Sequence, residues 1–370
     1  MKINKIIVKY HERFVGTLVQ TKNGKIAFQY SKEWIETGFS LNPFSLPLTE
    51  DVFIPGKNNF SGLFGVFADS LPDSWGNLIL DRILKKYDRL SNGVNLLERL
   101  AIIGNSGMGA LTYDPVFDFK LELSKMSLDE INIECKKILN HEETKNIDEL
   151  FKIGGSSGGA RPKVLLKIND TNWLIKFSNH IDGNDAGVVE YNYFECARKC
   201  GIDVPQTKLF KSNVNSGYFG IERFDINNDN RVHMVTVAGL LELDYRSPSL
   251  DYKDLIKLTK MLSTEADVYE MYRRMCFNVF SHNLDDHTKN FTFIYNEKNR
   301  RWRLSPAYDL TYSNTYFGEH TTSVNGKGRD ISDSDLLEVG RINRLDIEKC
   351  SRILAEIKEC VNTMLEKYLK

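Results

Sequence analysis

The sequence predicts an α+β protein in which a small mixed unit comes first and a mostly helical region comes last. Strand-like runs separated by turn residues occupy residues 14–19, 26–30, 164–177 and 218–224, whereas most of the chain beyond about residue 250 has the apolar spacing of helices. Of the 370 residues, 41% are hydrophobic, which is enough for two or three structural units with their own cores.

The first unit is expected to cover residues 1–115. It begins with a β-hairpin whose turn contains Asn23-Gly24, because both residues tolerate a positive φ. Two helices follow, the first of them after the start signals Pro72-Asp73, and strand character returns near the end of the unit.

The remaining residues, 116–370, are expected to divide at about residue 225. Before that point, helical spacing over residues 127–152 is followed by a glycine cluster, two strand-like runs and a helix that Gly201 closes. After that point helices dominate, interrupted by a hairpin over residues 290–304.

Charge and composition exclude several classes of function. The formal net charge of -1 gives no basic field for nucleic acid, so this chain alone is not expected to bind DNA strongly. No apolar run approaches the roughly 18 residues of a spanning helix, and the first residues do not form a signal peptide. The six cysteines include no CxxC pair, and Cys196 and Cys200, one helical turn apart, are expected to pack rather than bind metal. We therefore expect a cytoplasmic protein with no membrane contact.

Phosphoryl transfer is indicated by polar residues around the later hairpin. Asp285 and Asn290 are five residues apart, as in the kinase catalytic-loop pattern D-x-x-x-x-N, and Asp309 follows beyond the hairpin. In this chemistry one Asp orients the attacking hydroxyl, a lysine such as Lys289 offsets phosphate charge, and an Asn and a second Asp hold magnesium. The pattern is degenerate, and a solvated loop that caps a helix would contain similar residues.

The glycine cluster at residues 154–159 admits three interpretations. A Walker A loop is excluded because Ala160-Arg161 follows Gly159. A serine-hydrolase elbow around Ser157, with His287 and either Asp285 or Asp309, would need a strand before it and a helix after it, but Pro162 and a hairpin follow. The third interpretation is a loop that covers nucleotide phosphates with its backbone N–H groups, and a plain linker is the alternative.

The order of these features along the chain favours the nucleotide interpretation. In a protein kinase the phosphate loop precedes a strand lysine, a helical glutamate, the catalytic loop and the metal-binding Asp. Here the glycines precede Lys176, Glu190 and the catalytic-loop residues in the same order. Residues 221–224 fall where a kinase hinge would bind adenine through its backbone, although a plain strand is an alternative there.

Several segments together closely resemble the HipA family, the serine/threonine kinase toxins of bacterial type II toxin–antitoxin systems. The matching segments are residues 156–163, 221–225, 285–290 and 305–309, with residues 69–76 and 103–111 in the first unit. The resemblance covers essentially the whole chain. It implies a divergent protein-kinase-like two-lobed fold with a mostly helical C-lobe, preceded by a small α+β N-terminal subdomain.

The resemblance also implies ATP and Mg²⁺ as cofactors and a role for each site residue. Asp285 aligns with the catalytic Asp, with His287 and Lys289 beside it, and Asn290 and Asp309 align with the magnesium ligands. The implied nucleotide-binding residues are Gly158, Gly159, Ala160, Arg161 and Lys163 of the phosphate loop, Lys176 on a strand, and Glu222 and Phe224 at the hinge. The serine that such kinases autophosphorylate aligns with Ser156, with Ser157 beside it as the alternative.

The partners implied by the resemblance are a small helix-turn-helix antitoxin similar to HipB and a protein substrate, possibly an aminoacyl-tRNA synthetase. Operator DNA would be contacted only through the antitoxin, and the substrate does not carry over by motif. Two other functions stay open: an ATP-binding, weakly active co-repressor, and a kinase of small molecules or antibiotics.

Overall fold

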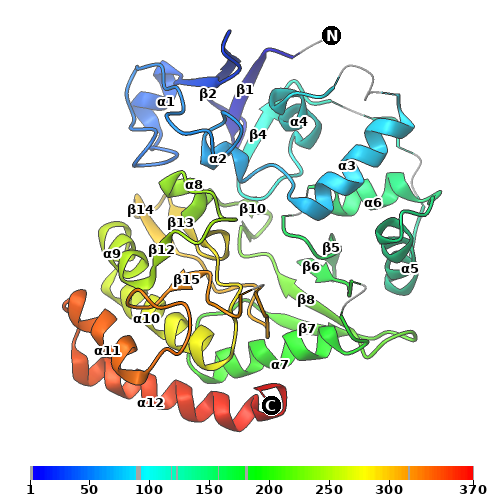
Figure 1. Cartoon of the computed structure of the whole chain (residues 1–370). Helices are drawn as coiled ribbons and strands as arrows, with labels where there is room; N and C mark the ends of the chain where they lie inside the picture. Colours follow the sequence, from blue (N-terminus) through cyan, green and yellow to red (C-terminus); the bar gives the residue numbers. More distant parts are fainter. Residues whose placement is uncertain are drawn as a thin grey trace. The chain divides into compact units, whose positions relative to one another are not determined.

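The computed structural model describes residues 3–88, 93–117, 119–121, 124–156, 158–179, 182–315 and 317–369. It contains both sheets and helices, so the predicted α+β class is confirmed (Figure 1). The chain forms two compact units. Unit 1 comprises Met1–Gly187, Phe210–Val235 and Gly239–Glu242, and unit 2 comprises Val188–Leu209, Thr236–Ala238 and Leu243–Lys370.

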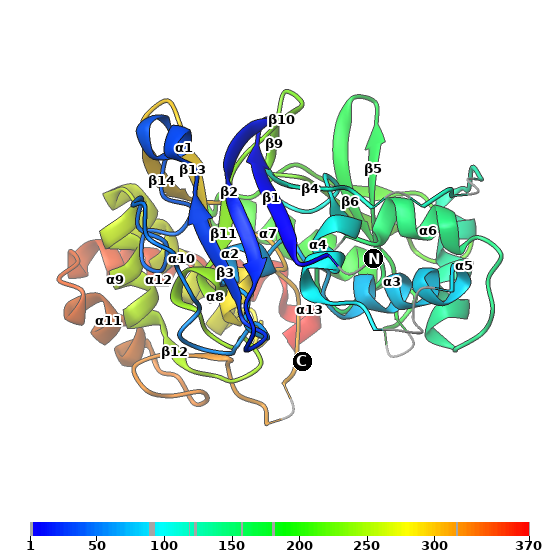
Figure 2. The same cartoon turned by 90° about the horizontal axis from the view of Figure 1, so that it is seen from above.

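The first sheet of unit 1 has the strand order β3-β2-β1-β4, and Figure 2 shows β1, β2 and β3 side by side. Its strands are β1 (Lys5–Tyr10), β2 (Arg13–Gln20), β3 (Ile26–Tyr30) and β4 (Leu111–Asp114). The hairpin expected from Asn23-Gly24 is the antiparallel pair β2 and β3, and Gly24 has a φ of 83°. The pattern analysis missed β1, in which buried Ile6 and Val8 alternate with more exposed positions.

Six helices described before residue 155 belong to unit 1. They are α1 (Lys32–Thr37), α2 (Gly65–Ala68), α3 (Ser74–Lys86), α4 (Leu96–Ile103), α5 (Leu128–Leu139) and α6 (Ile147–Gly154). Helix α4 begins with a capping box, in which Asn95 and Glu98 each bond the other's backbone N–H. The expected helices at residues 74–84 and 94–103 and the helical pattern over residues 127–152 correspond to α3, α4, and α5 with α6.

The second sheet has the order β5-β6-β8-β7. Its strands are β5 (Lys163–Ile168), β6 (Thr171–Lys176), β7 (Thr207–Phe210) and β8 (Tyr218–Glu222). Strand β8 ends at Glu222, so the expected strand through residue 224 is wrong at its end and Phe224 lies in a turn. Arg223 and Asp225 pair with each other within this turn.

One hydrophobic core spans the predicted boundary at residue 115. Trp75 and Ile79 of α3 pack in the same cluster as Ile153, Val164 and Ile175 from later elements of unit 1. The predicted limits 1–115 and 116–370 therefore separate residues that share a core, and as domain limits they stay a prediction.

Two helices and three short strands link these elements to the rest of the chain. They are α7 (Ala186–Lys199), β9 (Ile226–Asn227), β10 (Asn230–Arg231), β11 (Met234–Thr236) and α8 (Val237–Leu241). Gly201, expected to close α7, has a φ of 71°.

The later part of unit 2 is mostly helical, as expected. Its elements are β12 (Leu250–Asp251), α9 (Tyr252–Leu262), α10 (Glu265–Phe280), a 3₁₀ turn (Thr288–Asn290), β13 (Thr292–Asn296), β14 (Arg301–Leu304), β15 (Thr322–Ser323), α11 (Asp333–Ile342), α12 (Ile347–Met364) and α13 (Glu366–Leu369). Helix α10 packs against α9 and α12, and the predicted hairpin is β13 and β14. Among the helices described, none is long and apolar enough to cross a membrane.

Candidate active site

The predicted catalytic loop lies between α10 and β13 in unit 2. His282, with a φ of 56°, turns the chain after α10, and the loop then reaches the 3₁₀ turn that ends at Asn290. The Asn290 side-chain amide donates a 2.7 Å hydrogen bond to the carbonyl oxygen of Asp285, and Asp285 is exposed. The predicted base and one predicted metal ligand are therefore held in one turn.

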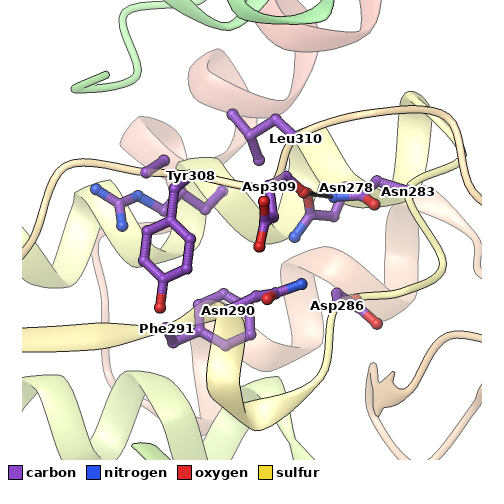
Figure 3. Close-up of a pocket in the computed structure, with 10 residues that line it drawn as sticks. Asn278, Asn283, Asp286, Asn290, Phe291, Tyr308, Asp309 and Leu310 are labelled. Carbon is purple, nitrogen blue, oxygen red and sulfur yellow. Dashed lines mark hydrogen bonds between the residues drawn. The ribbon is translucent and has the colours of Figure 1, made fainter. Parts of the chain in front are cut away.

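A pocket in unit 2 brings the two predicted magnesium ligands together (Figure 3). It is lined by Arg274, Asn278, Asn283, Asp286, Asn290, Phe291, Ala307, Tyr308, Asp309 and Leu310. The Asp309 carboxylate and the Asn290 amide point toward one another, whereas the Asp286 carboxyl points away. Carboxylate and amide oxygens are the hard donors that Mg²⁺ takes, so the chemistry of this pair fits the predicted ion.

Asp286, next to the predicted base, is a buried anchor that the sequence analysis missed. Its carboxylate is 1% exposed and accepts hydrogen bonds from the Tyr252 hydroxyl at 2.8 Å, His320 Nδ1 at 2.8 Å and the Thr322 N–H at 3.0 Å. Burial beside this carboxylate raises the pKa of Tyr252 well above its ordinary value. These bonds fix the loop to α9 and β15. In the sequence, only its position next to Asp285 could have pointed to Asp286 as part of the site. No sequence pattern pointed to His320.

A chain of hydrogen bonds continues from this anchor to the backbone of the predicted base. Asn278 donates to the Tyr252 hydroxyl at 2.9 Å, and Asn283 donates to Asn278 at 3.0 Å. The Ser313 hydroxyl donates to Asn283 at 3.0 Å and accepts the N–H of Asp285 at 3.0 Å. The backbone of Asp285 is thus held by the half-buried Ser313, which buried side chains position in turn.

The other two predicted loop residues lie beside one aromatic ring. Lys289 Nζ is 4.6 Å from the centroid of the Tyr245 ring. The centroids of the His287 and Tyr245 rings are 5.4 Å apart in an edge-on contact. His287 Nδ1 is buried and has no hydrogen-bond partner within the described ranges. The ring therefore supports both side chains on one side of the loop.

The predicted phosphate loop, in unit 1, runs from α6 to β5. The N–H of Gly159 donates to the Asp73 carboxylate at 3.0 Å, and the N–H of Trp75 donates to the Gly159 carbonyl at 3.2 Å. Asp73 thus holds the loop instead of capping α3. Gly159 has a φ of 85°, a left-handed conformation that favours glycine, and a Cβ there would lie 2.4 Å from Lys163 Nζ, so the lysine side chain would have to move.

The helix-to-strand course of this loop contradicts a hydrolase elbow, which runs from strand to helix. Ser157, the nucleophile of that alternative, lies outside the described residues. Ser156 is 7% exposed and donates a 2.8 Å hydrogen bond to the Ser106 carbonyl. The predicted modification site is therefore buried in unit 1.

The remaining phosphate-loop residues have mixed surroundings. Ala160 is exposed, Gly158 is half-buried, and Lys163 is buried at the start of β5. Arg161 forms a 3.0 Å ion pair with Asp182. The Arg161 side chain is half-buried, and its guanidinium is paired with this carboxylate in this conformation of the loop.

The predicted strand lysine and hinge are also in unit 1. Lys176 ends β6, with its Nζ 5.8 Å from the centroid of the Phe219 ring. Glu222 ends β8, next to the half-buried Phe224 turn. Glu190, the predicted helical glutamate, belongs to unit 2 and is buried in α7.

A buried ion pair holds the hinge turn, and the sequence analysis did not single it out. Asp225 accepts two hydrogen bonds from Arg223, at 2.7 and 3.0 Å, and one from the N–H of Gly109 at 2.7 Å. Burial disfavours the charged carboxylate, but Arg223 and the Gly109 N–H outweigh it and hold the pKa of Asp225 below its ordinary value. Arg231 donates to the carbonyl oxygens of Asn105 and Gly107, so the hinge is tied to the turn before β4.

Comparison with known proteins gives consistent matches. Residues 155–365 match the family model described as the HipA-like C-terminal domain, and residues 6–114 match the HipA N-terminal domain. Two similar proteins from Sinorhizobium fredii are named "Putative kinase Y4dM" and "Putative kinase Y4mE". The first is 24% identical over 88% of this chain and 81% of its own length, and the second is 25% identical over 85% and 79%.

A solved structure similar to this chain is that of HipA from Shewanella oneidensis MR-1, in a complex with HipB and its operator DNA. The two chains superpose with a TM-score of 0.74 at 18% identity, covering 98% of this chain and 91% of the other. This likeness confirms the fold predicted above.

Proposed function

Because the chain belongs to the HipA family, we propose that it is an ATP- and Mg²⁺-dependent protein serine/threonine kinase and the toxin of a type II toxin–antitoxin pair. The observation that carries the proposal is the pocket of unit 2, where Asn290 and Asp309 face one another beside the loop that bears Asp285 (Figure 3). The kinase names of the two Sinorhizobium relatives support the same reaction class.

The proposed reaction transfers the γ-phosphoryl group of ATP to a serine or threonine hydroxyl. The exposed carboxylate of Asp285 orients the hydroxyl and takes its proton, the oxygen bonds to the γ-phosphorus, and the bond to the leaving ADP breaks. Asn290 and Asp309 would hold Mg²⁺, which offsets phosphate charge when it is bound. Lys289 and Lys176 add positive charge for the phosphates.

The buried position of Ser156 supports a self-inactivating phosphate loop. A phosphate adds nearly two negative charges and cannot occupy the space beside the Ser106 carbonyl, which is itself a hydrogen-bond acceptor. Modification at Ser156 would therefore require the loop to leave its place and would keep it away from the nucleotide. The neighbouring Ser157 stays the alternative site of modification.

The proposed partners are a helix-turn-helix antitoxin similar to HipB and a cytoplasmic protein substrate, such as an aminoacyl-tRNA synthetase. The support for the antitoxin is the similar Shewanella protein, which was solved with HipB and operator DNA. That complex also favours the second candidate function, an ATP-binding co-repressor with little kinase activity.

The two candidates differ in what Asp285→Asn does. For a kinase, Asp285→Asn should bind ATP like the wild type but lower phosphoryl transfer at least about 100-fold, because it removes the group that takes the proton. Asp309→Asn should also raise the Mg²⁺ concentration needed for nucleotide binding. The matched control is Asp254→Asn, an exposed aspartate of α9. No transfer by a wild type that binds ATP would favour the co-repressor. Transfer by Asp285→Asn at the wild-type rate would instead overturn the role proposed for Asp285.

A further inference from the structure

Two cysteines that are one helical turn apart, Cys196 and Cys200, converge in unit 2 with Cys360 from far along the chain. Cys196 lies in the last turn of α7, Cys200 directly follows that helix, and Cys360 lies on α12 (both helices are labelled in Figure 1). The three Sγ atoms all lie within 4.8 Å of one another. A fourth sulfur, Sδ of Met364, is 3.8 Å from Cys360 Sγ.

The hydrogen bonds recorded around these thiols are weak. Cys196 Sγ donates to the Cys360 carbonyl and Cys360 Sγ donates to the Cys196 carbonyl, each at 3.9 Å. All six cysteines are free thiols. Groups of three or more cysteine, histidine or acidic side chains can hold a metal ion when their ligand atoms lie close together. Within the described part of the chain, these three cysteines are the only such group. We propose that Cys196, Cys200 and Cys360 form a binding site for Cu(I).

The donor set selects the type of cation. Thiolate sulfurs are soft ligands that bind Cu(I) and Zn²⁺, whereas Mg²⁺ takes hard oxygen ligands. A thioether beside them favours Cu(I), because Zn²⁺ sites in proteins use thiolate, imidazole or carboxylate ligands. Three thiolates can surround a single Cu(I), and the thioether of Met364 offers a weak additional ligand. The site is thus chemically distinct from the oxygen-lined pocket around Asp309.

Access and charge are compatible with such a site. Cys196 and Cys200 are 0% and 5% exposed, whereas Cys360 is only partly buried and gives the cation a route from solvent. Three thiolates and one Cu(I) would leave two net negative charges. The Arg273 guanidinium, which donates to the Cys200 carbonyl at 2.9 Å, and the nearby Lys199 offset part of that charge.

Each thiol that becomes a ligand releases its proton when the cation binds, because the thiolate is the form that binds metal. A bound cation would fasten α7, which also carries Glu190, to α12. The sequence analysis favoured packing for Cys196 and Cys200 because the third thiol follows far along the chain and gives no local signal.

The test is an anaerobic titration of the reduced full-length protein with Cu(I) held by the chromophoric chelator bicinchoninate. We expect the wild type to withdraw one Cu(I) per chain. Cys360→Ser should lose more affinity than the roughly 10–100-fold typical of residues that only support ligands. Cys135→Ser, which alters a buried cysteine of unit 1, is the matched control and should bind like the wild type.

A second variant, Met364→Leu, keeps all three thiols and should lose less affinity than Cys360→Ser. Failure of the wild type to withdraw Cu(I) would overturn the proposal, as would equal binding by folded Cys360→Ser. A wild type that only forms a disulfide within the trio would also overturn it. Because Cu(I) binding is measured without ATP, its outcome is separate from that of the kinase proposal.

Discussion

Asp285 and Asp286 are adjacent in the sequence but have opposite surroundings. Asp285 is exposed beside the pocket, whereas Asp286 is buried under three hydrogen-bond donors. A carboxylate that receives so many bonds is held in place and cannot reach a substrate, while the exposed one can. Two adjacent aspartates therefore have different roles: Asp285 is available for the proposed reaction, and Asp286 positions the loop.

Removing one donor to Asp286 should loosen the loop. His320→Ala leaves the buried carboxylate short of a hydrogen bond, so we expect the free energy of unfolding to fall by about 1–3 kcal/mol. Urea unfolding measures this loss. His320→Gln keeps an N–H donor and should lose less, and equal stability of His320→Ala and the wild type would contradict the anchoring role of His320.

At the scale of elements, the phosphate loop depends on the start of α3. Asp73 and Trp75 hold Gly159 from both its N–H and its carbonyl side. Sequence patterns predicted the helix and the glycine loop separately, because each has a local signal. Their contact was not predictable, because nothing in the sequence pairs residue 73 with residue 159.

Gly159→Ala should disturb this loop. The left-handed backbone costs an alanine about 1–2 kcal/mol, and its Cβ would meet Lys163 Nζ. We expect weaker ATP binding, measured by calorimetry, together with a lower free energy of unfolding. The control Gly56→Ala places its Cβ in open space and should bind ATP normally. Normal ATP binding by Gly159→Ala would show that this loop does not contribute to nucleotide binding.

Glu242 joins three segments of unit 1. Its carboxylate accepts the N–H of Gly65 at the start of α2 and the hydroxyl of Ser45, and its carbonyl accepts a bond from Asn59. Burial raises the pKa of this glutamate from 4.5 to about 7, against the effect of those donors. The folded state therefore keeps its proton over a pH range in which the unfolded chain loses it.

This difference gives a pH dependence of defined sign. As pH rises from about 4.5 to 7, the unfolded chain binds fewer protons than the folded one, so the stability from this group falls, by on the order of 1–2 kcal/mol after screening at a partly exposed site. Urea unfolding at several pH values should show a weaker fall for Glu242→Gln than for the wild type. Glu36→Gln, at an exposed glutamate, is the control. Identical slopes for Glu242→Gln and the wild type would contradict the raised pKa.

Across the whole molecule, local patterns predicted most helices and hairpins, including the turn at Asn23-Gly24 and the hairpin after Asn290. They missed β1 and the Asp225 and Asp286 networks, because those depend on partners far along the chain. Asn290 and Asp309 both line the oxygen-lined pocket, whereas Asp285, His287 and Lys289 are not among its lining residues. Which residues anchor them became visible only in three dimensions.

The shared core of unit 1 predicts that residues 116–370 cannot fold alone. Without α3 they lose Trp75, Ile79 and Ile83, all at most 1% exposed in that core, and each such loss costs about 2–5 kcal/mol. We expect an insoluble fragment, or one without a cooperative unfolding transition. A soluble fragment that unfolds cooperatively, as seen by circular dichroism, would show instead that the boundary at residue 115 separates independent domains.

Phosphoryl transfer by this chain is proposed to depend on Asp285. The most direct measurement is the intact mass of phosphatase-treated protein after incubation with ATP and Mg²⁺, beside Asp285→Asn. We predict a gain of one phosphate in the wild type, mapped by peptide analysis to Ser156 or Ser157, and none in Asp285→Asn. An equal gain in both proteins, or no gain in a wild type that binds ATP, would contradict the account.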